Sequence, residues 1–478
     1  MPIGSRASVA VSGLAVSTRS LYSQKQILIL GAGVTGLACA RSLTEREGHV
    51  TLIDDVKTQA EGFDISHTSA ISVTDFDYLV VSPGWKESHA IIVDAKKNGI
   101  PILNEIDLAW EIRQERSPGQ KWIALTGTNG KTTTVEMTAA ALRAGGMHAV
   151  ACGNVGRTVI ECVDSNENFE ALVLELSSFQ LHWLQRAEFV SCAILNIADD
   201  HTDWHGSFDL YAAAKTSILD RSLIAILNGD DSEVVLRTSH WNGRKVFYSL
   251  DTPKPGEIGL VEELLVDRAF VSDPQEASMI AELAEITPTV PHNVSNALAA
   301  AGLARTLGVA HEKIREALSH FSPGRHRIEV IAKENGITWI DDSKATNPHA
   351  AQASILSAFS VIWLAGGLTK NADVNTLVKR VHPRIKKAIL FGKDKDLFSS
   401  AFAEHAPHIE VVTVDPPTGY QPNTGSNAFM ESIVSHALSS AVEGDTVLLA
   451  PASASMDQFL SYADRGDRFA DAVRKALK

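Results

Sequence analysis

Cysteine is scarce in this chain, whose 478 residues include only Cys39, Cys152, Cys162 and Cys192. The four are scattered, and no pair has the C-x-x-C spacing of a zinc site or a redox motif. This argues against a disulfide framework and against a cysteine-rich metal site. We expect four reduced packing residues in a reducing compartment.

Long apolar runs and an excess of positive charge are also missing. No apolar segment reaches the roughly 20 residues that a transmembrane helix needs, and the net charge is -14. A broadly acidic chain binds nucleic acids and anionic membranes poorly, so any phosphate site must be built locally. We therefore expect neither a nucleic-acid partner nor a membrane partner. Hydrophobic residues make up 45% of the chain, which is typical of a globular protein with ample core.

Acidic residues are absent from the start of the chain, where the first is Glu45. Residues 1–24 contain six serines, Arg6 and Arg19. Such a composition fits a transit-type targeting segment, and it fits equally a disordered extension or a misassigned start. We treat residues 1–24 as an N-terminal extension and leave it out of the fold.

The rest of the chain alternates apolar strand-like segments with helical ones, which predicts an α/β fold with parallel sheets. At roughly 100–200 residues per domain, the length suggests about three domains. Polar stretches at 113–121 and 322–327 divide the chain into domains at 25–115, 116–323 and 324–478. Ligands of open parallel sheets bind at the carboxyl ends of strands, so the polar residues after each apolar run are the site candidates.

The segment GTNGKTT, residues 127–133, joins an apolar strand to a helix. Glycines let the backbone N–H groups point inward, and the helix N-terminus adds positive potential. Lys131 can reach phosphates, and the Thr132 hydroxyl suits Mg²⁺. A standard P-loop would begin with a glycine at position 125, where this chain has Leu125. We interpret the segment as a phosphate loop rather than as a simple turn with a surface lysine, and the missing first glycine leaves open whether it is a broken P-loop or a different one.

A second glycine-rich turn, GAGVTG, follows the first strand at residues 31–36. It matches G-x-G-x-x-G, and Asp54 lies about 20 residues further on, as in dinucleotide-binding domains. From these residues alone, an NAD site and a tight turn that binds another ligand or none are equally good interpretations.

Three other features are ambiguous by residue chemistry. Glu175 lies within an apolar strand, where a carboxylate needs a partner or a metal unless it faces solvent. The run ADDHTDWH after the next strand is either a solvated acidic loop or a metal or proton-transfer site around His201. Lys215 lies on an apolar helix, where a lysine usually extends to water and only a buried one reacts as an amine. From these residues alone we favour the solvent-facing interpretation for Glu175 and for Lys215.

Taken together, the motifs resemble those of the Mur ligases, over about residues 25–478. The following occur in order: G-T-N-G-K-T-T, L-E-L-S-S-F-Q-L, D-H-x-D, Y-x-A-A-K, H-N-x-x-N-A-L-A-A, H-R-x-E, D-S-K-A-T-N and A-S-x-D-Q-F. L-E-L-S-S-F-Q-L and D-S-K-A-T-N point to the member of the family that adds D-glutamate. The shorter phosphate loop is common to the whole family.

The resemblance implies three domains: a Rossmann-like N-terminal domain, a P-loop-type ATPase and a Rossmann-like C-terminal domain. The first would hold the UDP part of a nucleotide-sugar rather than NAD, through Val34, Thr35, Asp54, Ser82 and Gly84. Asp55 and Val56 stand where a threonine and an arginine would be expected.

For the central domain, the resemblance implies that ATP and two Mg²⁺ ions are bound. The nucleotide would contact Gly127, Thr128, Asn129, Gly130, Lys131, Thr132, Thr133, Asn293, Asn296, Arg327 and Asp342. The metal ligands would be Thr132, Glu175, His201 and a carbamylated Lys215. Lys131, His201, Lys215 and Lys344 would be the catalytic residues. Asn154, Thr346, Lys370, Ser455 and Tyr462 would contact the substrates, and Ser455 is expected where the last strand gives way to a helix, whose N-terminus favours an anion.

The activity implied is the ATP-dependent joining of UDP-MurNAc-L-alanine to D-glutamate through an acyl phosphate, in cytoplasmic peptidoglycan precursor synthesis by a monomer. Three alternatives stay open: a folylpolyglutamate-type ligase that accepts L-glutamate, a dinucleotide oxidoreductase, and a nucleotide-binding scaffold without activity. The joint presence of Lys131, Glu175, His201 and Lys215 argues against the scaffold.

Overall fold

A computed structural model of the chain describes residues 20–60, 62–273, 275–422 and 426–478. The chain divides into two compact units, residues 1–118 and 119–478, and each is considered by itself. No helix among the described residues is both long enough and apolar enough to cross a bilayer.

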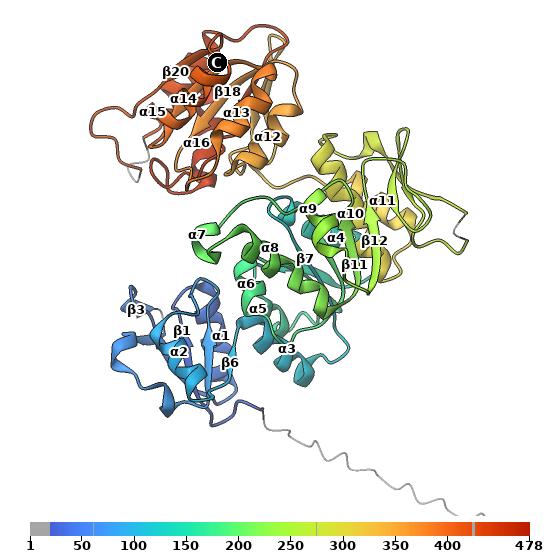
Figure 1. Cartoon of the computed structure of the whole chain (residues 1–478), viewed down its shortest axis with the longest axis vertical. Coiled ribbons are helices and arrows are strands. Elements are labelled where there is room, and N and C mark those ends of the chain that lie inside the picture. Colours follow the sequence, from blue (N-terminus) through green and yellow to red (C-terminus); the bar gives the residue numbers. More distant parts are fainter. Residues whose placement is uncertain (1–19, 61, 274, 423–425) are drawn as a thin grey trace, which may run out of the picture. The chain divides into compact units, whose positions relative to one another are not determined.

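The first unit is built on one six-stranded sheet with the strand order β3-β4-β2-β1-β5-β6 (Figure 1). Its strands are β1 (Gln26–Leu30), β2 (His49–Ile53), β3 (Gln59–Ala60), β4 (Phe63–Ser66), β5 (Tyr78–Val81) and β6 (Ile102–Leu103), and its helices are α1 (Val34–Glu45), α2 (Ala90–Lys97) and α3 (Glu105–Arg116). All strand pairs except β3–β4 are parallel, as predicted. Most of the predicted extension, residues 1–19, lies outside the described residues. Tyr22 is buried, with its ring 5.5 Å from that of Tyr78.

The second unit contains two sheets, and the first has nine strands in the order β15-β14-β13-β12-β11-β10-β7-β9-β8. Its strands are β7 (Lys121–Thr126), β8 (Ala149–Gly153), β9 (Ala171–Glu175), β10 (Phe189–Ile194), β11 (Ser222–Asn228), β12 (Arg244–Tyr248), β13 (Ile258–Val261), β14 (Leu264–Asp267) and β15 (Ser278–Glu282). Strands β13 to β15, which were not predicted, pair antiparallel at this edge, so the sheet is mixed.

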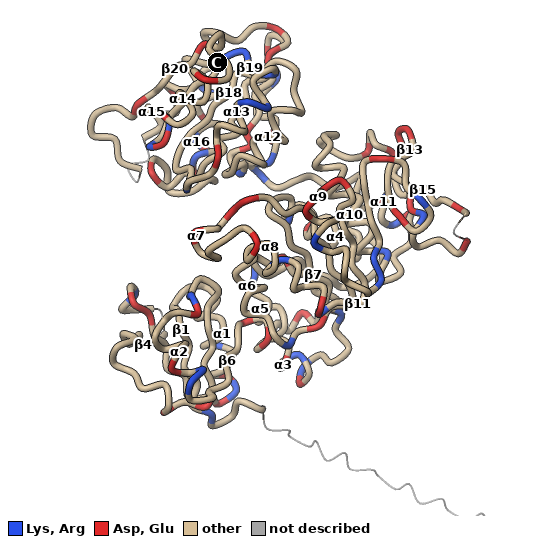
Figure 2. The backbone as a smooth tube through the Cα atoms, in the orientation of Figure 1, with Lys and Arg blue, Asp and Glu red and all other residues tan. Residues whose placement is uncertain are grey.

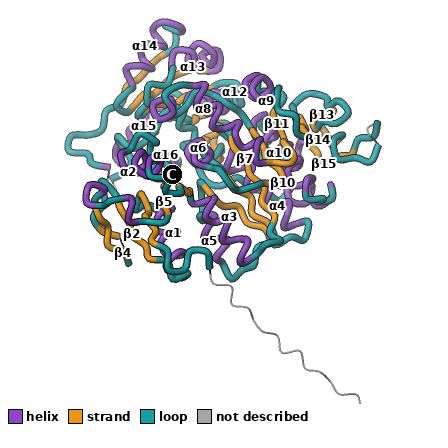
Figure 3. The backbone as a smooth tube through the Cα atoms, turned by 60° about the horizontal axis from the view of Figure 1, so that its bottom comes forward, coloured by secondary structure: helices purple, strands orange, loops and turns teal. Residues whose placement is uncertain are grey.

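Helices lie around this sheet, with α4 and α10 labelled beside its strands in Figure 3, and α11 packs against α4 and β15. The helices are α4 (Lys131–Ala144), α5 (Val159–Asp164), α6 (Ser178–Trp183), α7 (Thr202–His205), α8 (Phe208–Thr216), α9 (Ser232–Thr238), α10 (Pro291–Thr306) and α11 (His311–Ser319). Apolar side chains such as Val135, Leu298 and Ile226 fill one continuous core between these helices and the strands. Burial of this apolar surface fixes the strand ends that carry the polar loops.

The last sheet has six strands in the order β16-β17-β21-β18-β19-β20, with an apolar core on each face. Its strands are β16 (Glu329–Glu334), β17 (Ile337–Asp341), β18 (Val361–Gly366), β19 (Ile385–Phe391), β20 (Glu410–Thr413) and β21 (Thr446–Leu449), and its helices are α12 (Pro348–Leu356), α13 (Val374–Val381), α14 (Lys395–His405), α15 (Ala428–Leu438) and α16 (Tyr462–Ala476). The predicted α/β class is confirmed for all three sheets.

Candidate active site

The phosphate loop lies between β7 and α4, as the sequence predicts. Gly130 adopts the left-handed region with φ of +81°, and an added Cβ would lie 2.4 Å from Asn296 Oδ1. Asn196, just after β10, holds the loop from the neighbouring strand: its Oδ1 accepts from Asn129 N at 2.8 Å, and its Nδ2 donates to Asn129 O at 3.1 Å. The loop is therefore a fixed cradle at the start of a helix, where anions bind.

Two lysines converge on one carbonyl oxygen of this loop. Lys131 Nζ donates to Gly127 O and to Thr128 O, both at 2.9 Å. Lys215 Nζ, from α8, donates to the same Gly127 O at 2.8 Å. Lys215 is 2% exposed, so the expectation that it extends to water was wrong. Burial lowers its pKa well below the usual value, and the neighbouring Lys131 lowers it further.

Glu175 closes the other side of the loop from the end of β9. It is 1% exposed, which overturns the solvent-facing interpretation. Its Oε1 accepts a hydrogen bond from Asn154 Nδ2 at 3.0 Å, whereas its Oε2 accepts none from the described residues. A buried carboxylate oxygen without a donor is costly. A cation relieves that cost, so the site fits a metal ion bound by this carboxylate.

His201 and the acidic run before α7 border the same loop, and Figure 2 shows these acidic residues next to α7. The His201 backbone has φ of +53°, and its Nε2 lies 3.6 Å from Asp200 Oδ2. Burial lowers the pKa of His201, and the Asp200 carboxylate opposes this shift. The ring packs against Phe179 at 4.8 Å. A neutral imidazole beside a carboxylate can bind a metal or orient a substrate.

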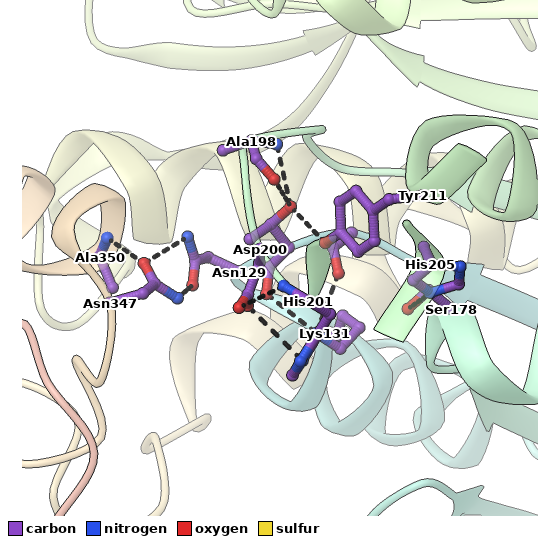
Figure 4. A network of polar contacts seen from close by, with 12 residues as sticks. Asn129, Lys131, Ser178, Ala198, Asp200, His201, His205, Tyr211, Asn347 and Ala350 are labelled. Carbon is purple, nitrogen blue, oxygen red and sulfur yellow. Dashed lines mark hydrogen bonds and ion pairs between the residues drawn. The ribbon is translucent and has the colours of Figure 1, made fainter. Parts of the chain in front are cut away.

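A cavity of about 530 Å³ joins these groups to the last sheet. Of the predicted residues, its lining includes Thr128, Asn129, Gly130, Lys131, Thr132, Thr133, Asn154, Glu175, His201, Asn293, Asn296, Arg327, Asp342, Lys344 and Thr346. Gly127, the first residue of the loop, and Lys215, which donates to its carbonyl oxygen, are not among the lining residues. Figure 4 shows part of the polar network at the loop, with Lys131, Asp200 and His201 labelled. The cavity is large enough for a nucleotide together with a second small substrate.

Several lining residues had not been singled out from the sequence. They are Asn228, Asp230, Asp231, His292, Asn347 and His349. Asp230 and Asp231 directly follow β11, so the rule on strand ends could have found them. Burial lowers the pKa of His292 to about 4, so this side chain is neutral at physiological pH.

The segment that follows β17 contributes one acid and one base to the cavity. Asp342 accepts a short hydrogen bond from Ser354 Oγ, and burial raises its pKa to about 6. The Lys344 ammonium lies 3.8 Å from the centre of the Tyr462 ring. Burial, with Arg327 nearby, lowers the pKa of Lys344 to about 8.

Three predicted substrate contacts, Lys370, Ser455 and Tyr462, lie after strands of this last sheet and outside the cavity lining. Leu368 and Ala454 form an antiparallel bridge, which brings the adjacent Lys370 and Ser455 into one region. Ser455 is buried in a turn, and α16 begins only at Tyr462. The expected helix N-terminus at Ser455 was therefore wrong, because a turn separates the end of β21 from the helix.

In the first unit, the predicted nucleotide-sugar residues gather around the GAGVTG turn. Asp54 Oδ2 accepts from Ala32 N at 2.8 Å, and Ser82 Oγ donates to Gly31 O at 3.4 Å. Val34, the first residue of α1, is 70% exposed, and Thr35 follows it. Gly84 lies in the turn after β5. Strand ends β1, β2 and β5 thus form one polar edge, as in other parallel sheets that bind ligands.

The chain matches three family models in succession. They are the Mur ligase MurD-like N-terminal domain at residues 25–104, the Mur ligase middle domain at 125–304 and the Mur ligase glutamate ligase domain at 326–453. The solved structure of a pseudomurein peptide ligase type C from Methanothermus fervidus is 19% identical, with a TM-score of 0.57 over 95% of this chain and all of that one. At this identity the likeness shows the fold alone.

Curated relatives share far more of the sequence. The UDP-N-acetylmuramoylalanine–D-glutamate ligase of Thermobifida fusca is 43% identical over 94% of this chain and 98% of its own length. The protein of the same name from Streptomyces coelicolor is 41% identical over 95% of this chain and 99% of its own. Because both proteins are similar over their full length, the chain belongs to the Mur ligase family.

Proposed function

We propose that this protein is the ATP-dependent, ADP-forming ligase that joins D-glutamate to UDP-N-acetylmuramoyl-L-alanine in peptidoglycan precursor synthesis. One observation carries the proposal: a single cavity contains a phosphate loop, a buried carboxylate with a free oxygen, and an acid and a lysine from the last sheet. Relatives with 43% and 41% identity are named for this reaction. In this proposal, residues 25–115 bind the UDP substrate, residues 116–323 bind ATP and residues 324–478 bind D-glutamate.

The chemistry requires that a carboxylate oxygen become a leaving group. In the proposed first step, an oxygen of the L-alanyl carboxylate attacks the γ-phosphorus of ATP, and the bond from that phosphorus to ADP breaks. In the second step, the D-glutamate nitrogen attacks the acyl carbon. The bond from carbon to the phosphate oxygen then breaks, phosphate leaves, and the nitrogen loses a proton to give the amide.

The loop residues are placed for the first step. Phosphoryl transfer is catalysed mainly by positioning and by neutralisation of charge. Backbone N–H groups of 127–133 and the Lys131 ammonium would bind the phosphates, with Asn293 and Asn296 from α10 alongside. Arg327 and Asp342 would contact the nucleotide from the last sheet. Lys131 now donates to its own loop carbonyls, so bound phosphate would replace two hydrogen bonds that Lys131 already makes.

The metal ligands proposed are Thr132, Glu175, His201 and a carbamylated Lys215. When bound, Mg²⁺ supplies positive charge that screens the phosphate and carboxylate groups from each other. Support for Lys215 is chemical: it is buried and its pKa is low, so its amine is available as a nucleophile. Its nitrogen would add to the carbon of CO₂ and lose a proton, which leaves an anionic ligand with two oxygens suited to a hard cation.

The remaining roles concern the two substrates. Asn154 lies at the Glu175 side of the cavity and would contact the acceptor, and His201 would orient it or a metal rather than act as general base. Thr346, Lys370, Ser455 and Tyr462 would hold D-glutamate, with Lys344 balancing its charge. Val34, Thr35, Asp54, Ser82 and Gly84 would bind the UDP group.

The test is phosphate release by purified protein given ATP, Mg²⁺ and UDP-MurNAc-L-alanine. D-glutamate, L-glutamate and no amino acid are compared, and the amide product is identified by mass. We expect phosphate and product with D-glutamate alone. Release with L-glutamate would favour the folylpolyglutamate-type alternative, and nicotinamide fluorescence on binding would favour the oxidoreductase.

A further inference from the structure

The side chains of Asn129 and Asn347 are hydrogen-bonded to each other at the cavity wall, and Asn347 caps α12 (Figure 4). Asn196 holds the backbone of Asn129 in the phosphate loop. Asn347 Nδ2 donates to Asn129 Oδ1 at 3.0 Å. In return, Asn129 Nδ2 donates to Asn347 Oδ1 at 3.4 Å and to His349 Nδ1 at 3.0 Å.

A backbone group fixes the orientation of every amide in this contact. The Ala350 N–H donates to Asn347 Oδ1 at 2.9 Å, so the oxygen of Asn347 must face the helix. Its Nδ2 then faces Asn129, which must present its own oxygen. The Asn129 amide nitrogen is thereby directed at His349 Nδ1, which must be the unprotonated ring nitrogen. The arrangement therefore has one consistent assignment rather than several.

The contact joins the two parts of the site that hold different substrates. Asn129 belongs to the loop proposed to bind phosphates. Asn347 ends the segment 342–347, which also contributes Asp342, Lys344 and Thr346 to the cavity. Reacting atoms must come within roughly 3–3.5 Å, and an error of about 1 Å can cost on the order of 100-fold in rate. A contact between these two segments would control that distance.

We propose that Asn129 and Asn347 are positioning residues that hold the segment 342–347 at the phosphate loop, so that the amine reaches the acyl phosphate. This inference rests on the proposed function. The pair acts on the second chemical step, because Asn347 adjoins Thr346, a proposed D-glutamate contact. Asp342, the proposed nucleotide contact at the other end of the segment, is held separately by Ser354 Oγ. The side chain of Asn129 is committed to this contact, so its contribution to phosphate binding is through the backbone.

The decisive variant is Asn347→Ser. Serine keeps the cap on α12, because its hydroxyl can accept from Ala350 N, but it is too short to reach Asn129. Asp373→Ser is the matched control: Asp373 caps α13 on the same sheet, its Oδ1 accepts from Asn375 N at 2.9 Å, and it lies outside the cavity lining. Equal thermal unfolding of the two variants will show that Asn347→Ser has not simply lost its helix.

Two rates are measured on the full chain. The first step is followed without amino acid, by trapping the acyl phosphate with hydroxylamine in the presence of ATP and UDP-MurNAc-L-alanine. The second is amide formation with D-glutamate. We expect Asn347→Ser to keep trapping within about twofold and to lose on the order of 10-fold or more in amide formation. Asp373→Ser should match wild type in both.

A double-mutant cycle completes the test. Asn129→Ser should be slow in amide formation, and the double variant should be no slower than the slower single variant, because one contact is lost in each case. Additive losses, an equal fall in both steps, or normal amide formation by Asn347→Ser would overturn the inference. If wild-type protein forms no amide, the proposed function fails instead, which is a separate result.

Discussion

Replacing Gly130 by alanine tests the geometry of the phosphate loop more sharply than any loss of charge. At φ of +81° an alanine is strained by about 1–2 kcal/mol. Its Cβ would also lie 2.4 Å from Asn296 Oδ1, and an ordinary contact begins at 3.4 Å. Asn296 would therefore have to move by about 1 Å within a buried helix, at a further cost of about 1 kcal/mol.

The matched control is Gly146→Ala, just beyond the other end of α4. Gly146 has φ of +89°, and nothing lies within 4 Å of its added Cβ. This variant has the backbone strain without the clash, so it should cost about 1–2 kcal/mol, against roughly 2–3 kcal/mol for Gly130→Ala. Calorimetric unfolding measures both costs. Because Asn296 is a proposed ATP contact, ATP affinity measured by titration calorimetry should fall about tenfold or more in Gly130→Ala alone. Equal unfolding and equal affinity in the two variants would refute the placement of Asn296 against the loop.

Three other changes have defined outcomes. Lys131→Met should abolish ADP formation, because it removes the ammonium group from the loop. A coupled ADP assay measures this, and turnover by the variant would contradict the role of Lys131 in phosphate binding. Lys215→Met should lose most activity and unfold at the same temperature as wild type, since Gly127 O still accepts from Lys131. The carbamate is tested separately by intact-mass measurement. Fully active wild-type protein whose mass shows no carbamate would argue against the modification. Burial lowers the pKa of His205 from 6.5 to about 4, so stability should be full above about pH 6.5 and fall as the pH drops toward 4. Calorimetry across that range should show a flatter dependence for His205→Phe, and an unchanged dependence would refute the assignment.

The sequence predicted the strands that carry the site better than it predicted the environment of single residues. The strands expected before GAGVTG, before GTNGKTT, around Glu175 and before ADDHTDWH are β1, β7, β9 and β10. The antiparallel strands β13 to β15 were not predicted. The expected helix start at Ser455 was wrong because the alanine, proline and serine residues after β21 do not reveal how long the connection to the next helix is.

Burial of Glu175 and Lys215 could not be predicted from neighbouring residues. β9 is buried on both faces, so no alternation marks which of its side chains meets solvent. Lys215 lies on a helix whose inner face is directed at a loop 88 residues earlier in the chain. Such contacts depend on long-range packing, which also explains why Asn347 and His349 were not singled out. The family resemblance supplied the proposed roles of Glu175 and Lys215, which their burial is compatible with.

Lys131 and Lys215 both donate to the carbonyl oxygen of Gly127, and this closeness affects the charge of the buried Lys215. Two ammonium groups that donate to one oxygen at 2.8 and 2.9 Å lie within about 6 Å of each other. With an effective dielectric constant near 20, their repulsion is about 3 kcal/mol, which favours the neutral amine at Lys215 because Lys131 is more accessible to solvent. A carbamate at Lys215 would reverse the sign of this interaction and place a negative charge beside both Lys131 and the free oxygen of Glu175. That oxygen and the carbamate would repel each other unless a divalent cation lay between them, so the modification and the metal would depend on one another.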